Sequence, residues 1–173
     1  MERGVVVSRP VPIDLAAARD FLLLNTESGE LFWKKKPNRN IVVGSEAGTV
    51  RPDRYRVISI NRQRILAHRL VWALMHGEQP PDEIDHIDGD PSNNRPSNLR
   101  AASHAQNVAN QKSSRRNTSG VRGVYFSRAR GKWVAQITAA GDKKYIGIFS
   151  SISDAQAAYN SAAERNFGAF VRR

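Results

Sequence analysis

The segment EIDHIDGDPSNNRPSNLRAASHAQN, residues 83–107, constrains the fold of this chain more than any other part. Its first residues are typical of a short strand, and a run of turn-forming Asp, Gly, Pro, Ser and Asn follows over 88–94. Residues 99–102 can pair back as a second strand. Ser103 and Gln106 then have the S-x-x-Q spacing of a capping box, which predicts that a helix begins there. The local pattern therefore predicts a ββα unit.

Three polar residues of this unit match the parts of a phosphodiester hydrolase. Asp85 and Asn107 offer hard oxygen atoms to a divalent cation such as Mg²⁺, which prefers oxygen ligands and keeps several waters. The neutral imidazole of His86 can take a proton from an attacking water. Because neighbours on a regular strand point to opposite faces, Asp85 and His86 can act on one phosphate only at a strand end or irregularity.

Each of these residues also has a structural interpretation when it is taken alone. Asp85 can cap a loop, and His86 can be a half-buried imidazole with its hydrogen bonds satisfied. Asn98 and Asn107 can be a turn amide and a helix-surface amide. The joint occurrence of the residues, in this order and in a basic chain, favours the metal-dependent nuclease. His68 heads an apolar helical pattern, and we interpret it as structural.

The charge of the chain indicates a polyanionic partner. The 173 residues carry a net charge of +11, which suits nucleic acid or an anionic membrane face. No apolar stretch approaches the about 20 residues of a membrane-spanning helix, and no secretory signal is visible. The absence of cysteine excludes disulfides and thiolate zinc sites, and it fits a reducing compartment. We therefore expect a cytoplasmic protein that binds double-stranded DNA and has no membrane association.

The positive charge is concentrated in one stretch of the chain. No acidic residue occurs between Asp90 and Asp142, whereas nine Lys and Arg residues do. Such a stretch can be a solvated surface kept for solubility. Because it joins two segments that carry motifs, we interpret it as an electrostatic track for nucleic acid, in which each neutralised phosphate steepens the salt dependence of binding.

Residues 66–110 resemble the HNH endonucleases, in the subgroup where Asp replaces the first His and Asn the last. The similarity rests on the HRLVW opening, the DHIDGD turn, the NNRPSNL run and the trailing HAQN. The resemblance implies that Asp85 and Asn107 coordinate one divalent ion, Mg²⁺ or Mn²⁺, and that His86 is the general base. It further implies that Asn98 ties the loop so that His86 faces the scissile phosphate. A phage or mobile-element enzyme, including a homing endonuclease in a bacterial host cell, is the expectation.

The carboxy-terminal part has the pattern of a second module. Three short strands are predicted within residues 121–149, and Ser153 and Gln156 have the spacing of a cap for a final helix ending before Gly168. In the middle strand, Trp133, Ala135 and Ile137 would pack on this helix, while the alternate residues would form the exposed face.

The motifs RGVYF, GKWVAQI, YIGIF and DAQAAYNSAAE of this module resemble the plant ethylene-response-factor (Apetala-type) domain, over residues 119–169. The resemblance implies that the exposed sheet face enters the major groove of DNA. The candidate DNA contacts, with two arginines of the preceding linker, are Arg115, Arg116, Arg122, Tyr125, Arg128, Arg130, Lys132, Gln136, Thr138, Lys143 and Tyr145.

The sequence as a whole predicts a modular α+β protein, with a central ββα-metal unit and a carboxy-terminal three-stranded antiparallel sheet packed on one helix. The predicted segments are a helix and β-hairpin element (1–65), the nuclease domain (66–110), a basic linker (111–119) and the DNA-binding domain (120–173). A single catalytic centre favours a monomer. The alternative is a DNA-binding regulator or architectural protein without catalysis, and the retention of His86 beside Asp85 argues against it.

Overall fold

Local signals in the sequence set the elements of the amino-terminal part. Asp14 caps helix α1 (Leu15–Phe21), because its carboxylate accepts a hydrogen bond from the Ala17 N–H at 3.0 Å. Helix α2 (Ala67–His76) ends where Gly77 adopts a left-handed conformation. A hairpin and a three-stranded antiparallel sheet precede α2. In the hairpin, β1 (Leu22–Leu24) pairs with β2 (Leu31–Trp33). In the sheet, β4 (Arg56–Ile60) pairs with both β3 (Thr49–Val50) and β5 (Gln63–Leu66).

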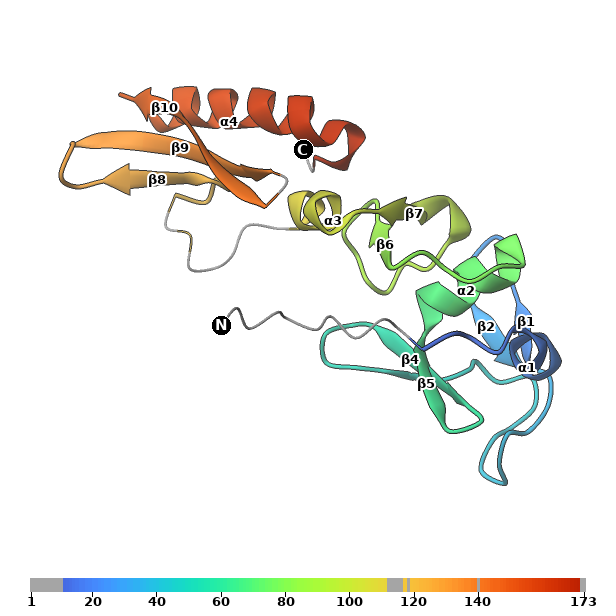
Figure 1. Cartoon of the computed structure of the whole chain (residues 1–173). Helices are drawn as coiled ribbons and strands as arrows, with labels where there is room; N and C mark the ends of the chain where they lie inside the picture. Colours follow the sequence, from blue (N-terminus) through green and yellow to red (C-terminus); the bar gives the residue numbers. More distant parts are fainter. Residues whose placement is uncertain (1–10, 112–116, 118, 140, 172–173) are drawn as a thin grey trace, which may run out of the picture. The chain divides into compact units, whose positions relative to one another are not determined.

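The computed structural model describes residues 11–111, 117, 119–139 and 141–171, which form two compact units (Figure 1). The first unit holds the described residues up to His86 together with Asp90–Ala101. The second unit holds Ile87–Gly89 and the described residues from Ala102 onwards. Within the described residues, no helix has both the length and the apolar character needed to cross a bilayer.

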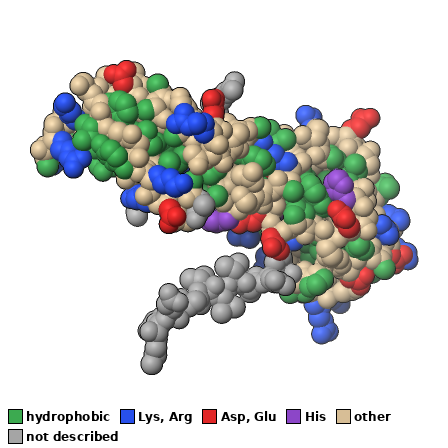
Figure 2. All heavy atoms as spheres, turned by 45° about the horizontal axis from the view of Figure 1, so that its top comes forward, with side chains coloured by type: hydrophobic (Ala, Val, Ile, Leu, Met, Phe, Trp, Pro, Cys, Tyr) green, Lys and Arg blue, Asp and Glu red, His purple; other side chains and the backbone are tan. Residues whose placement is uncertain are grey.

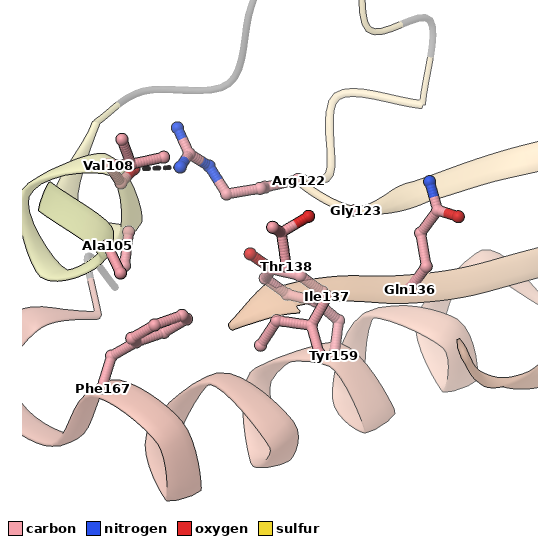
Figure 3. Close-up of a pocket in the computed structure, with 10 residues that line it drawn as sticks. Ala105, Val108, Arg122, Gly123, Gln136, Ile137, Thr138, Tyr159 and Phe167 are labelled. Carbon is pink, nitrogen blue, oxygen red and sulfur yellow. Dashed lines mark hydrogen bonds between the residues drawn. The ribbon is translucent and has the colours of Figure 1, made fainter. Parts of the chain in front are cut away.

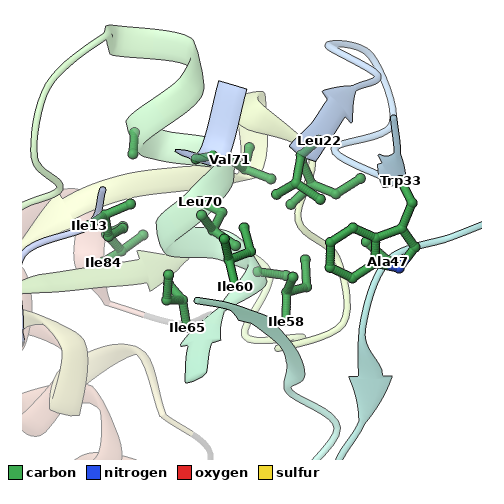
Figure 4. Close-up of a cluster of buried hydrophobic side chains, with 14 of the residues drawn as sticks. Ile13, Leu22, Trp33, Ala47, Ile58, Ile60, Ile65, Leu70, Val71 and Ile84 are labelled. Atoms are coloured by element: carbon green, nitrogen blue, oxygen red, sulfur yellow. The ribbon is translucent and has the colours of Figure 1, made fainter. Parts of the chain in front are cut away.

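The core of the first unit is built mainly by the amino-terminal hairpins and α2. Figure 4 shows Ile58, Leu70 and Val71 among the side chains that converge there, and all three are fully buried. Ile84 and Leu99, which belong to the motif segment, are buried in the same cluster. The amino-terminal element therefore supports the strands on which the motif residues lie.

The motif segment forms the predicted ββα unit. Strand β6 (Glu83–His86) pairs with β7 (Leu99–Ala102), which follows a short 3₁₀ turn, η1 (Pro96–Asn98). Helix α3 (His104–Asn110) begins with the predicted capping box, in which Ser103 and Gln106 satisfy each other's backbone N–H groups. His86 is the last residue of β6, so the Asp85–His86 pair stands at a strand end.

The second unit contains a three-stranded antiparallel sheet packed on one helix, which confirms the predicted fold class. The sheet has the order β10-β9-β8, and helix α4 covers one of its faces. The elements are β8 (Val124–Ser127), β9 (Lys132–Ala139), β10 (Asp142–Phe149), α4 (Ile152–Phe167) and a terminal 3₁₀ turn, η2 (Gly168–Phe170). The core beneath the sheet includes Ala135, Ile137, Tyr159 and Phe167, and Trp133 packs against it as predicted.

The predicted cap of α4 is wrong by two residues. Ser151, not Ser153, accepts the hydrogen bond from the Asp154 N–H, at 3.1 Å. The Ser151 hydroxyl also donates to the Asp154 carboxylate at 2.7 Å. Both serines have a suitable residue three positions later, and the carboxylate in the first turn of the helix favours Ser151.

Candidate active site

Asp85 is buried and paired with an arginine that the sequence analysis did not select. Its side chain is 4% exposed, and its Oδ2 accepts hydrogen bonds from Arg100 Nε at 2.8 Å and from Arg100 Nη2 at 2.7 Å. Asp85 comes from β6 and Arg100 from the neighbouring strand β7. The guanidinium compensates the buried negative charge and fixes the plane of the carboxylate.

His86 is buried in a cluster of rings. The ring centroids of His86 and His68 are 5.0 Å apart in an edge-to-face arrangement, and Tyr55 lies 6.0 Å from His86 and 5.6 Å from His68. On its polar side, His86 Nε2 lies 3.2 Å from Asn94 Oδ1. This contact favours the tautomer with the proton on Nε2, in which Nδ1 is the basic nitrogen.

Asn98 and Asn94 shape the loop that follows β6. The Asn98 side chain is buried, and its Nδ2 donates to the carbonyl oxygen of Asn93 at 2.8 Å. Asn93 precedes Asn94, whose side chain contacts His86. In the middle of the same loop, Arg54 donates to Asp90 at 2.8 Å and to Ser92 at 3.1 Å. Asn98 thus ties the backbone next to the residue that holds His86.

Asn107 lies in the second unit, in the first turns of α3. Its backbone N–H donates to the Ser103 carbonyl at 2.9 Å, and its side chain is half-buried. His104, in the same helix, is exposed. Asp85, in contrast, lies in the first unit.

The donor set fits a hard divalent ion. Asp85 and Asn107 contribute a carboxylate and an amide, and Mg²⁺ or Mn²⁺ accepts few protein oxygens together with water. The described residues contain no group of three or more His, Cys, Asp or Glu side chains placed to hold a metal. A site with two protein oxygens leaves coordination positions for the oxygens of a phosphate.

A polar hollow of about 220 Å³ adjoins the His86 loop within the first unit. Asn94 lies in its wall, together with Arg54, Arg56 and Arg95. Arg54 pairs with Asp90 and Arg56 with Glu46, each at 2.8 Å. The hollow places polar and cationic groups beside the residue that contacts the candidate base.

The sheet of the second unit presents several predicted DNA contacts on its open face. The register places Lys143 opposite Thr138 and Tyr145 opposite Gln136, with an irregularity between Tyr145 and Gly147. The exposed candidates are Tyr125, Arg128, Arg130, Lys132, Thr138, Lys143 and Tyr145, and Gln136 is half-buried. In Figure 2, the Lys and Arg side chains of the visible face occur at several separate places rather than in one patch.

Three of the predicted DNA contacts differ from this group. Arg115 and Arg116 lie outside the described residues. Arg122 is half-buried, and its guanidinium donates to the carbonyl oxygens of Val108 and Gln111 at the end of α3. Its contact with DNA stays a prediction, and its observed partners belong to the protein.

Sequence reasoning missed two residues that surround the candidate site. Arg100 was one of the nine cations of the basic stretch, whereas it is the ion-pair partner of Asp85. Asn94 was treated as a turn residue. The occurrence of Asn94 inside the quoted motif NNRPSNL, and of Arg100 directly after it, was the available signal. His68 was interpreted as structural, and its ring packs against His86.

We expect His68 to make the stability of the protein depend on pH below neutrality. Burial, and secondarily the nearby His86 and Arg69, lower the pKa of His68 from 6.5 to about 3. The unfolded chain therefore binds a proton in a range where the folded protein keeps His68 neutral. As the pH falls from 6.5 towards 3, the free energy of unfolding should decrease by about 1.4 kcal/mol per pH unit.

Urea unfolding of the wild type and of His68→Gln at a series of pH values tests this expectation. Between pH 6.5 and pH 5 the wild type should lose about 2 kcal/mol more than the variant. Equal losses in the two proteins would show that His68 is not the titrating group.

Comparison with known proteins agrees with the geometry of the motif segment. Residues 66–109 match the HNH endonuclease family. Protein 3.8 of Escherichia phage T7 is 41% identical over 75 residues, which is 43% of this chain and 62% of that protein. An uncharacterised HNH endonuclease of Acanthamoeba polyphaga mimivirus is 33% identical over 116 residues, 66% of this chain and 59% of that protein.

The chain spans about three fifths of the length of each of these two viral relatives. No solved structure matches it. The family match ends at residue 109, and the likeness of residues 119–169 to the ethylene-response-factor domain stays a prediction. The match falls on the central segment whose resemblance to the HNH endonucleases was predicted.

Proposed function

We propose that this protein is a metal-dependent DNA endonuclease that hydrolyses phosphodiester bonds, and that the sheet of its second unit binds the target. The observation that carries the proposal is the Asp85–His86 pair at the end of β6, where both side chains are buried and each has its own polar partner. The match of residues 66–109 to the HNH endonuclease family supports it.

In this proposal Asp85 and Asn107 hold one divalent ion, Mg²⁺ or Mn²⁺. A bound ion would neutralise the negative charge that develops on the phosphate and on the leaving 3′ oxygen. Arg100 keeps the Asp85 carboxylate in a fixed orientation through its two hydrogen bonds to Oδ2. The helix that carries Asn107 starts at a capping box, which sets its first turn.

His86 is the proposed general base. Asn94 Oδ1 accepts a hydrogen bond from the Nε2–H group and orients the imidazole, so that Nδ1 takes the proton of the attacking water. Asn98 acts through the loop backbone, because its side chain holds Asn93, the residue before Asn94. Hydrolysis leaves a 5′ phosphate and a 3′ hydroxyl.

The target-binding role of the sheet rests on its exposed polar and aromatic side chains. Tyr145 is 61% exposed and lies opposite Gln136, and Lys143 lies beside it opposite Thr138. Such side chains can hydrogen-bond base edges and phosphates when a sheet lies in the major groove. A phage or mobile-element enzyme of the homing type, acting as a monomer in the cytoplasm of a bacterial host, is the setting we propose.

Cleavage of supercoiled plasmid tests the proposal. The purified protein should convert the supercoiled form to the nicked form with Mg²⁺ or Mn²⁺, and EDTA should stop the reaction. Binding should be measured in parallel by gel shift without metal. A protein that binds the plasmid tightly yet never relaxes it with either metal would instead be a DNA-binding regulator.

A further inference from the structure

Helix α3, which carries Asn107, is built into the second unit. Its alanines Ala105 and Ala109 pack against the core beneath the sheet, and the helix contacts α4 and η2. Asn110 is buried, and its Nδ2 donates to the Ile87 carbonyl at 3.4 Å. The carboxy-terminal module therefore supplies the surface on which the helix of the HNH domain rests.

The apolar contact beneath α3 is incomplete. A groove of about 190 Å³ lies between α3, β9 and α4, with Ile137, Tyr159 and Phe167 among its lining residues. Figure 3 shows Phe167 and Tyr159 rising from α4 towards this groove, with α3 on one side and β9 on the other. The side chains of Ala105 and Ala109 on α3 are small and leave this space unfilled, so the groove contributes no dispersion contacts to the packing of the helix.

Arg122 bridges the edge of this groove. Its guanidinium donates through Nη1 to the Val108 carbonyl (Figure 3). It also donates through Nη2 to the Gln111 carbonyl at 2.8 Å. These oxygens belong to the carboxyl end of α3, where the helix dipole favours a cation. The Val108 carbonyl also accepts a hydrogen bond from the Gln111 N–H at 3.2 Å. Arg122 thus caps α3 from a segment outside the HNH domain.

The backbone next to Arg122 is closely packed. Gly123 has φ +67°, and a Cβ at this position would lie 2.3 Å from the Gln136 carbonyl oxygen and 2.4 Å from the Tyr159 ring. The Gln136 N–H also donates to the Gly123 carbonyl at 2.8 Å. The backbone that carries Arg122 is therefore held against β9 and α4. Its guanidinium, through two hydrogen bonds, connects this part of the structure to α3.

We propose that Arg122 is a positioning residue for the metal site, through which the carboxy-terminal module holds the helix that carries Asn107. The inference rests on the proposed function, because it takes Asn107 as a metal ligand. It departs from the expectation of an independent targeting module joined to the nuclease by a linker. In that arrangement Arg122 contacts DNA and has no effect on the binding of a metal ion.

The test uses the full chain with three substitutions. Arg122→Met removes both hydrogen bonds and keeps a long side chain, and Arg122→Lys keeps the charge but not the forked geometry. Arg165→Met removes an exposed arginine of α4 and serves as the matched control. Binding of Mn²⁺ is measured by electron paramagnetic resonance without DNA, and the Mn²⁺ concentration for half-maximal plasmid nicking is measured separately.

Arg122→Met should weaken Mn²⁺ binding by about tenfold and raise the half-maximal concentration by the same factor, as loss of supporting residues around a metal ligand does. The nicking rate at saturating Mn²⁺ should stay within about twofold of the wild type, since the reacting groups are unchanged. Arg122→Lys should recover part of the affinity, and Arg165→Met should behave like the wild type.

The outcomes separate this inference from the proposed function. Unchanged Mn²⁺ affinity in Arg122→Met, together with weaker plasmid binding without metal, would overturn the positioning role and assign Arg122 to DNA contact. Unchanged affinity for both Mn²⁺ and plasmid would overturn it as well. A wild-type protein that neither binds Mn²⁺ nor nicks DNA would overturn the proposed function, and the inference with it.

Discussion

Replacing His86 with alanine should reduce plasmid nicking by about 10²- to 10⁴-fold, the usual contribution of a general base. The substitution removes the imidazole that Asn94 orients and leaves the Asp85–Arg100 ion pair untouched. Binding of plasmid without metal should remain within about twofold of the wild type, because the proposed DNA contacts lie elsewhere. The rate is measured from the conversion of supercoiled to nicked plasmid at saturating Mg²⁺.

His76→Ala is the matched control for this experiment. His76 is an exposed histidine at the end of α2 that stacks on Trp72, with ring centroids 4.4 Å apart. Its removal should leave nicking unchanged. Because His86 is buried, thermal unfolding of His86→Ala must be recorded as well. A folded His86→Ala protein that nicks at the wild-type rate would exclude His86 as the base.

Replacing Arg100 with methionine should destabilise the protein by about 3–5 kcal/mol, the cost of leaving one partner of a buried ion pair without its counter-charge. Asp85 is 4% and Arg100 18% exposed at the side chain, so water cannot easily replace the guanidinium. The measurement is urea unfolding at pH 7. Nicking should fall too, because the Asp85 carboxylate loses the two hydrogen bonds that orient it.

Two further variants show whether burial is the cause of this effect. Arg54→Met breaks the Arg54–Asp90 pair, whose side chains are 60% and 35% exposed, and should cost about 1 kcal/mol or less. The double variant Arg100→Met with Asp85→Asn removes the buried charge along with its partner and should recover part of the stability while staying inactive. An Arg100→Met protein as stable as Arg54→Met would contradict the buried-pair interpretation.

Much of the local structure was predictable because the signals that set it act over a few residues. The Ser103–Gln106 box begins α3 where expected, since it acts on backbone groups within one turn. Asp14 and Gly77 act over the same short range at the start of α1 and the end of α2. Alternation in β9 correctly assigned Trp133 to the helix side of the sheet. The predicted cap of α4 was wrong because Ser151 and Ser153 both have a suitable residue three positions later.

The residues around the candidate site were predictable only in part. The types that suit the chemistry, Asp85 and His86, stood out in the sequence by their order in the motif. Their partners did not, because an ion pair between β6 and β7 and a ring contact between α2 and β6 depend on long-range packing. Nothing in the local pattern distinguishes Arg100 from the other eight cations of the basic stretch.

The sequence by itself determined the elements, the order of the motif residues and the expectation of a polyanionic partner, because periodicity, capping and charge are local or additive properties. Only the tertiary structure decided that Arg100 neutralises Asp85 and that Asn94 and His68 flank His86. Only the tertiary structure showed that α3 belongs to the same unit as the carboxy-terminal sheet and that Arg122 caps this helix. The physical reason is that burial and ion pairing depend on contacts between segments that are distant in the sequence, and the spacing of residues along the chain does not predict these contacts.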